Sequence, residues 1–237
     1  MSSLLLIRHG QARAFDVDSD RLSDLGRDQA RRLGEHLVSL GIDFDEVHVG
    51  ALVRQRQTAE LVGEAFRAAG RGWPEPLMDA AWNEYDSGGV LGTLLPALAA
   101  RDESFAKLVQ EFQAAAGRPD KNRYFQRMFE ALMDSWERGA IESGDVEPFA
   151  SFHERVRTAF HRVTSTGGSR QIAVFTSGGP IGVCTQVVLD APPKTSLRLN
   201  WRVKNASLTE VVFSAGRASL EYFNVVEYLD PAHRTFR

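Results

Sequence analysis

The sequence predicts an α/β protein: a three-layer α/β/α sandwich with a mostly parallel sheet. The continuous apolar run Leu4–Ile7 is typical of a strand buried on both faces of a parallel sheet, and Gln171–Thr176 is a second segment that predicts a buried strand. In the first third of the chain, strand-like and helix-like segments alternate, which is the order that βαβ units require. Together these two observations are typical of a parallel sheet with covering helices.

In the first third of the chain, capping residues and the spacing of apolar residues both indicate where the helices lie. After the first strand, Ser23 can cap a helix, and Gly41 can end it. The apolar residues between them recur at helical spacing: Ala30, Leu33, Leu37 and Leu40. A short strand is expected at Glu46–Val49, followed by a second helix from about Val53 to Ala69.

Between about residues 86 and 147 the pattern changes to helix-like stretches without a convincing strand. These stretches are Leu94–Ala100, Glu103–Ala116 and Arg123–Arg138. We interpret this segment as a helical insertion, a cap over a site, within a single domain that spans residues 1–237.

The last third returns to the α/β pattern. A helix at Phe149–Val163 precedes the strand Gln171–Thr176, and Gly178-Gly179-Pro180 opens another helix with proline in its first turn. Ser207–Phe213 and Ala218–Val225 predict an antiparallel hairpin at the sheet edge.

Composition excludes several classes of function. A net charge of -3 gives no basic surface for nucleic acid or for an anionic membrane, so neither is expected as a partner. The single cysteine excludes an internal disulfide framework. The apolar N-terminal run is too short for a signal-peptide core and no segment is long enough to span a membrane, which predicts a cytoplasmic protein.

Polar side chains follow three of the expected strands, where ligands bind in open α/β sheets. Arg8-His9-Gly10 follows the first strand, Arg54 lies just beyond the second, and Thr176-Ser177-Gly178-Gly179 follows the late strand. A neutral imidazole can attack phosphorus, and fixed arginines can stabilise the charge on the transferred group. Glu84 is a plausible proton source, although Asp79 and Asp86 are nearby alternatives. No metal or cofactor is required if arginines supply the positive charge.

The motif Leu-Ile-Arg8-His9-Gly10-Gln11 resembles the signature of the histidine phosphatase, or phosphoglycerate mutase-like, superfamily. Supporting matches follow in the family's order: Leu22–Ala30, Leu52–Ala59, and Asn83-Glu84 followed by Gly88, Gly89 and Gly92. The resemblance implies that His9 is the phosphorylated nucleophile, that Arg8 and Arg54 bind the phosphate, and that Glu84 protonates the leaving group. It implies a substrate-binding group composed of Arg8, Arg54, Gln11, Ser177 and Gly178.

Two positions depart from that family pattern. Ser177 stands where the family usually has a second histidine, and Gly50 stands where it usually has serine. Serine can donate a hydrogen bond but brings no charge, a loss of roughly 10²–10³ in rate by analogy with removing one preorganised donor. The amides of Ser177, Gly178 and Gly179 could offset part of this loss, and His48 is a less favoured stand-in for the histidine.

These observations predict a metal-independent phosphatase that hydrolyses a small phosphomonoester through phosphohistidine on His9. Two alternatives remain open: a weakened or inactive pseudo-enzyme that binds a phosphorylated ligand, and a phosphoglycerate mutase. The identity of the substrate and the oligomeric state do not follow from the sequence.

Overall fold

The computed structural model describes residues 1–13, 20–142, 144–165, 168–214 and 216–236. The chain divides into two compact units. The first combines Met1–Glu84 with Arg155–Arg237, and the second is Tyr85–Glu154. The second unit contains the segment that the sequence predicts as a helical insertion; its role as a cap stays a prediction.

Six strands of the described residues form one mixed sheet in the first unit, in the order β3-β2-β4-β1-β5-β6. They are β1 (Ser2–Arg8), β2 (Glu46–Val49), β3 (Leu77–Met78), β4 (Gln171–Thr176), β5 (Leu208–Ser214) and β6 (Arg217–Val225). The first four in this order are parallel neighbours, whereas β5 pairs antiparallel with both β1 and β6. The predicted α/β class is therefore confirmed, as is the antiparallel hairpin at the edge.

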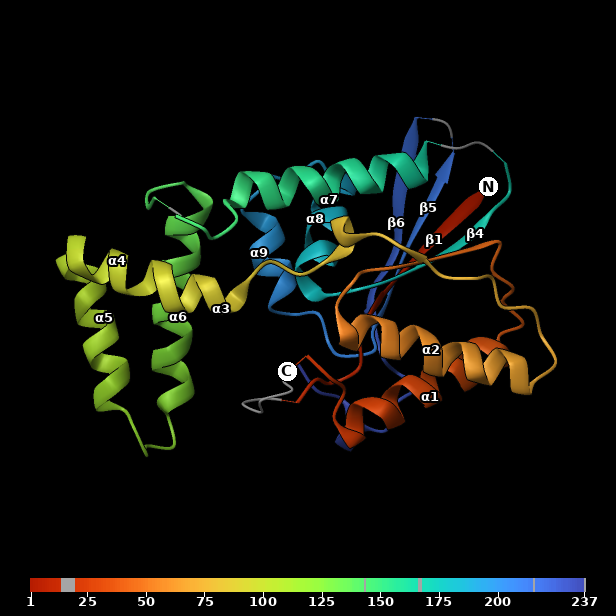
Figure 1. The fold of residues 1–237 in the computed structure, drawn as a ribbon, viewed down its shortest axis with the longest axis horizontal. Helices are drawn as coiled ribbons and strands as arrows, with labels where there is room; N and C mark the ends of the chain where they lie inside the picture. Colours follow the sequence, from red (N-terminus) through yellow and green to blue (C-terminus); the bar gives the residue numbers. More distant parts are fainter. Residues whose placement is uncertain (14–19, 143, 166–167, 215, 237) are drawn as a thin grey trace. The chain divides into compact units, whose positions relative to one another are not determined.

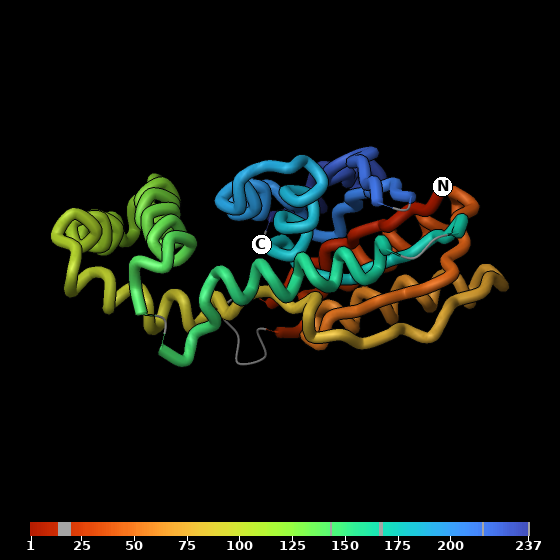
Figure 2. The backbone as a smooth tube through the Cα atoms, turned by 90° about the horizontal axis from the view of Figure 1, so that it is seen from above, coloured from red at the N-terminus to blue at the C-terminus, as the bar shows by residue number. Residues whose placement is uncertain are grey.

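Helices cover both faces of this sheet. The helices of the first unit are α1 (Asp24–Ser39), α2 (Val53–Ala68), α7 (Phe149–Thr164, in this unit from Arg155), α8 (Gly178–Val188) and α9 (Thr195–Asn200). Side chains of α1 and α2 share a buried apolar cluster with Leu5 and Ile7 of β1. Leu4 and Leu6 alternate to the other face, and both views place α2 and α8 on opposite sides of β1 (Figure 1 and Figure 2).

The described elements of the second unit are all helical, as the sequence predicts. They are α3 (Ser87–Gly89), a π-helical turn (Val90–Leu94), α4 (Leu95–Arg101), α5 (Glu103–Ala114), α6 (Lys121–Glu137) and the part of α7 that precedes Arg155. Its buried side chains include an aromatic group in which Tyr85, Trp136 and Phe152 contact one another. Among the described residues of the whole chain, no helix combines the length and apolar character that crossing a bilayer requires.

Two glycines allow the start of α1 to pack closely against the loop that follows β1. A Cβ on Gly10 would lie 2.3 Å from the carbonyl oxygen of Gly26, and a Cβ on Gly26 would lie 2.0 Å from that of Gln11. Ser23 caps the same helix by accepting a hydrogen bond from the Gly26 amide at 3.0 Å. The start of α1 thereby packs directly against the backbone of Gly10 and Gln11.

The two-residue strand β3 and the short helix α9 were not predicted. A run of two apolar residues after Pro76 is too short to show a strand period, and both side chains of β3 are exposed. The strand nevertheless matters, because its pairing with His48 and Val49 of β2 sets the direction in which the chain continues to Glu84.

Candidate functional site

Four parallel strands end at one edge of the sheet, and each delivers a candidate residue there. The amide of His9, after β1, donates to the carbonyl of Thr176 at the end of β4 (3.0 Å). The amide of Gly50, after β2, donates to the carbonyl of Phe175 (3.1 Å). The segment after β3 joins the same edge through the 3₁₀ turn Ala80–Trp82. The topology thus places the loops that carry His9, Arg54, Glu84 and Ser177 side by side.

His9 has only 6% of its surface exposed. Its Nε2 lies 3.2 Å from Nε of Arg54, and its Nδ1 lies 2.6 Å from the carbonyl oxygen of Gly10. An arginine Nε can only donate, so Nε2 accepts, and a neutral ring then carries its proton on Nδ1 and donates it to Gly10. This arrangement leaves the nucleophilic lone pair on Nε2.

The surroundings of His9 disfavour its charged form. Burial lowers the pKa of the imidazole well below the usual 6.5, and the guanidinium groups of Arg54 and Arg8 lower it further. The carbonyl of Gly10 acts in the opposite direction. The ring is therefore the neutral, nucleophilic form at neutral pH.

This shift predicts how stability depends on pH. Below pH 6.5 the unfolded chain binds a proton on His9 that the folded protein does not, so the unfolding free energy falls by up to about 1.4 kcal/mol per pH unit until the folded pKa is reached. We expect His9→Gln to lose less stability than wild type between about pH 7.5 and about pH 5.5, measured by urea unfolding. Equal losses in the two proteins would show that the folded imidazole titrates normally.

Arg54 is the second residue of α2, and hydrogen bonds hold both its side chain and its backbone. Its Nη1 donates to Oδ1 of Asp20 at 2.6 Å, while its backbone carbonyl accepts from the hydroxyl of Thr58 at 2.7 Å. The same hydroxyl accepts from the amide of Gly10 at 3.1 Å. Thr58 therefore joins the first turns of α2 directly to the residue after the histidine.

Arg8, the last residue of β1, is the second guanidinium that acts on the imidazole. Its Nη1 donates to the backbone carbonyls of Val203 and, at 2.9 Å, Phe236. Both arginines thus lower the pKa of His9, and they come from different elements: Arg54 from the start of α2 and Arg8 from the end of β1.

Glu84 and the segment that precedes it are held by α8 and α7. The amide of Gly179, in the first turn of α8, donates to both carboxylate oxygens of Glu84, at 3.1 and 3.0 Å. Arg155 of α7 donates from Nη1 to the carbonyls of Ala81 and Asn83, at 3.0 and 2.9 Å. The amide of Gly179, one of the helix-start amides predicted to bind phosphate, therefore donates to the candidate acid Glu84 in this structure.

Ser177 is completely buried and bonded to a residue that the sequence did not single out. Nε2 of Gln55 donates to the hydroxyl of Ser177 at 2.9 Å and to the carbonyl of Trp82 at 3.1 Å. Oε1 of Gln55 accepts from the amide of Leu52 at 3.2 Å, and a Cβ on Gly50 would lie 2.0 Å from this oxygen. Gly50 and Ser177, the two residues that differ from the usual family pattern, therefore both pack against the buried side-chain amide of Gln55.

The remaining predicted residues have contacts of their own. Oε1 of Gln11 accepts from the capping hydroxyl of Ser23 at 2.9 Å. Gly178 begins α8, where a Cβ would lie 2.2 Å from Oδ1 of Asn200. His48 in β2 lies 3.2 Å from the carboxylate of Glu46. Roles for these residues toward a phosphate stay predictions.

Three residues in these contacts were missed from the sequence: Asp20, Gln55 and Arg155. Gln55 adjoins Arg54, but nothing in its spacing distinguishes it from the exposed Arg56. Arg155 is 71 positions from Glu84 along the chain, so its contacts carry no local signal. Asp20 is one of three alternating aspartates, at positions 16, 18 and 20, and the sequence pattern does not single out one of these carboxylates.

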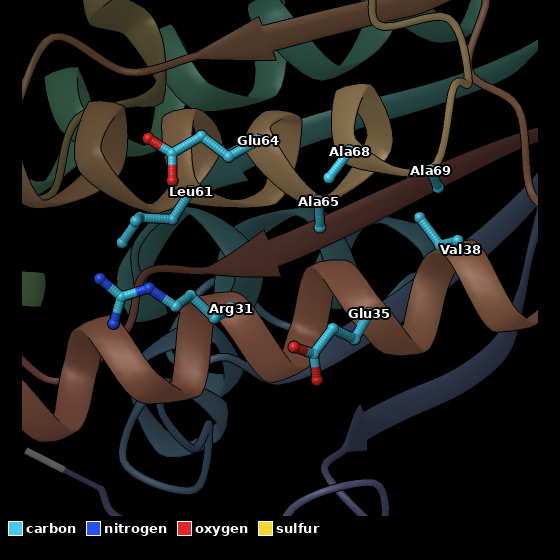
Figure 3. Close-up of a pocket in the computed structure, with 8 residues that line it drawn as sticks. All are labelled: Arg31, Glu35, Val38, Leu61, Glu64, Ala65, Ala68 and Ala69. Carbon is cyan, nitrogen blue, oxygen red and sulfur yellow. The ribbon is translucent and has the colours of Figure 1, made fainter.

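Within the described part of the chain, no group of three or more histidine, cysteine or acidic side chains could hold a metal ion. A surface hollow of about 490 Å³ lies between α1 and α2 (Figure 3). It is lined by Arg31, Glu35, Val38, Leu61, Glu64, Ala65, Ala68 and Ala69. None of these residues belongs to the candidate site, so the hollow is a separate feature.

Comparison with known proteins identifies the family. The sequence profile of the histidine phosphatase superfamily (branch 1) matches residues 4–121 and 114–226, which is most of the chain. The protein belongs to the histidine phosphatase superfamily. Members of this superfamily are phosphatases and mutases, which are enzymes of phosphoryl transfer.

The protein is similar to relatives with different reactions. Over 63 residues it is 41% identical to the mitochondrial serine/threonine-protein phosphatase Pgam5 of Drosophila grimshawi, covering 25% of this chain and 21% of that protein. Over 95 residues it is 36% identical to the 2,3-bisphosphoglycerate-dependent phosphoglycerate mutase of Azorhizobium caulinodans, covering 38% of this chain and 45% of the mutase. The chain therefore matches less than half the length of these curated relatives.

A solved structure extends the likeness over nearly the whole chain. The α-ribazole phosphatase from Shigella flexneri superposes with a TM-score of 0.63 at 19% identity, covering 94% of this chain and 96% of that one. At this identity the likeness shows a shared fold and not a shared substrate.

Proposed function

We propose that this member of the histidine phosphatase superfamily is a metal-independent phosphatase that hydrolyses a small phosphomonoester through phosphohistidine on His9. The observation that carries the proposal is the state of the imidazole: buried, uncharged and presenting Nε2 to a guanidinium. A neutral ring held in one tautomer can attack phosphorus, and its arginine neighbours supply positive charge where the transferred group must lie.

The reaction would proceed in two balanced steps. In the first, Nε2 of His9 forms a bond to phosphorus, the ester P–O bond breaks, and Glu84 as the carboxylic acid gives its proton to the leaving alkoxide. In the second, Glu84 as the carboxylate accepts a proton from water, the resulting hydroxide equivalent attacks phosphorus, and the P–N bond breaks to release phosphate. His9 and Glu84 return to their starting states.

Each remaining residue has a stated part in this proposal. Arg8 and Arg54 bind the phosphoryl oxygens and stabilise the charge spread over them in the transition state. Gln11, Ser177 and Gly178 complete the substrate-binding group, with hydroxyl, amide and backbone donors in place of a further charge.

The proposal is tested by looking for the covalent intermediate. The purified protein is mixed with p-nitrophenyl phosphate, quenched in alkali after milliseconds to seconds, and analysed for acid-labile protein-bound phosphate alongside released phosphate. We expect a burst of phosphohistidine on His9 followed by steady release. Turnover without any acid-labile phosphoprotein, under conditions where a phosphohistidine standard survives, would contradict the covalent route.

Two observations keep alternatives in view. The burial of Ser177 against Gln55 leaves this side of the site without an added positive charge, which favours a pseudo-enzyme that binds a phosphorylated ligand. The similarity to a phosphoglycerate mutase favours retransfer to substrate. Absence of both phosphohistidine and turnover, with inorganic phosphate still bound, would support the first; conversion of 3-phosphoglycerate to its 2-isomer would support the second.

A further inference from the structure

The carboxylate of Asp20 accepts hydrogen bonds from a guanidinium and a helix-start amide, two kinds of donor that also bind phosphate. Asp20 accepts from Nη1 of Arg54 at 2.6 Å through Oδ1 and from the backbone amide of Val53 at 2.8 Å through Oδ2. Val53 is the first residue of α2, so the carboxylate lies at a helix N-terminus. Helix-start amides and guanidinium groups are the donors that proteins use for phosphate oxygens.

The same contact continues to the nucleophile. Arg54 donates from Nη1 to Asp20 and from Nε to Nε2 of His9 at 3.2 Å, which gives a chain from carboxylate to guanidinium to imidazole. The lone pair on Nε2 cannot accept a hydrogen bond from Arg54 and form a bond to phosphorus at once. The guanidinium must therefore shift before His9 can attack.

We propose that Asp20 acts as an internal anion at the phosphate site: it holds Arg54 over Nε2 of His9 in the free protein and gives way to the phosphoryl group of the substrate. This inference rests on the proposed function. Asp20 competes with the substrate for Arg54, so part of the binding energy of the phosphoryl group is spent on displacing it. The side chain of Asp20 is 39% exposed and that of Arg54 is 20% exposed, so the carboxylate can move toward solvent when it is displaced.

The direction in which KM and kcat change in Asp20→Asn distinguishes two roles for Asp20: competing with the substrate for Arg54, or positioning Arg54 for the reaction. Asparagine in place of Asp20 keeps an oxygen for the Val53 amide but removes the charge. If Asp20 competes, Asp20→Asn lowers KM for p-nitrophenyl phosphate and the inhibition constant of inorganic phosphate about two- to fivefold, the effect of one partly exposed ion pair. If Asp20 instead positions Arg54 for chemistry, kcat falls and KM does not.

The experiment compares wild type, Asp20→Asn and the control Asp43→Asn in steady-state kinetics and in inhibition by inorganic phosphate. Asp43 also forms an ion pair with an arginine, Arg71, at 2.7 Å. It precedes β2, so it lies at the opposite, amino end of the strands from His9, and its substitution changes the net charge equally. We expect the control to match wild type.

Tighter phosphate inhibition and a lower KM in Asp20→Asn alone would support the inference. Unchanged or raised values in Asp20→Asn, or an equal decrease in Asp43→Asn, would overturn it while leaving the phosphatase proposal intact. Failure of the proposed function is a separate result, because wild type itself would then form no phosphohistidine.

Discussion

Replacing His9 by alanine is expected to abolish acid-labile phosphoprotein and to lower kcat on the order of 10⁴–10⁶-fold, the range seen when an enzyme loses its nucleophile. The imidazole is the group whose lone pair is directed at Arg54, and the described contacts place no second nucleophile beside it. Water would have to attack phosphorus directly in the variant. The measurement is single-turnover chemistry with p-nitrophenyl phosphate, combined with alkaline-quench detection of phosphohistidine.

A matched control is His48→Ala. His48 also has a pKa lowered by burial and lies in β2, the strand that leads to Arg54, but its ring contacts Glu46 and not the two arginines. It should retain wild-type rates within a few fold. The nucleophile assignment fails if His9→Ala keeps more than about a hundredth of the wild-type rate, whereas loss of activity in His48→Ala would revive its role as a substitute for a second histidine.

The elements that carry the site could be predicted from the sequence, because their signals are local. The strands at Glu46–Val49 and Gln171–Thr176 have the predicted ends, and Ser23 caps its helix as expected. Motif order then placed His9, Arg54 and Ser177 after parallel strands, and parallel strands end at the same edge.

What could not be predicted depends on contacts between distant residues. The contact of Ser177 with Gln55 is one example: the two residues are 122 positions apart, and the side-chain amide of Gln55 donates to the serine hydroxyl. Such a partner is decided by packing that only the folded chain provides, and the role of Ser177 toward a phosphate stays a prediction. The same holds for Asp20, whose partner is the helix start 33 positions later.

Replacing Glu84 by glutamine is expected to slow hydrolysis of an alkyl phosphate about 10²–10⁴-fold, the contribution typical of a positioned general acid. The glutamine oxygen can still accept from the amide of Gly179, so the segment keeps its anchor while losing the transferable proton. For p-nitrophenyl phosphate the effect on phosphohistidine formation should be much smaller, since p-nitrophenolate is a weak base and leaves without a proton. The measurement is the rate of enzyme phosphorylation with both esters.

The contrast between the two esters is what distinguishes an acid from a structural residue. A variant that had merely lost its fold or its phosphate site would be slow with both leaving groups to the same extent. Asp86→Asn provides the control, because Asp86 also accepts from a helix-start amide, that of Gly89 at 2.9 Å, and stands two positions from Glu84. If Asp86→Asn showed the leaving-group dependence and Glu84→Gln did not, the proton would come from Asp86. A dependence confined to Glu84→Gln would assign the proton to the carboxyl that the amide of Gly179 holds beside the start of α8.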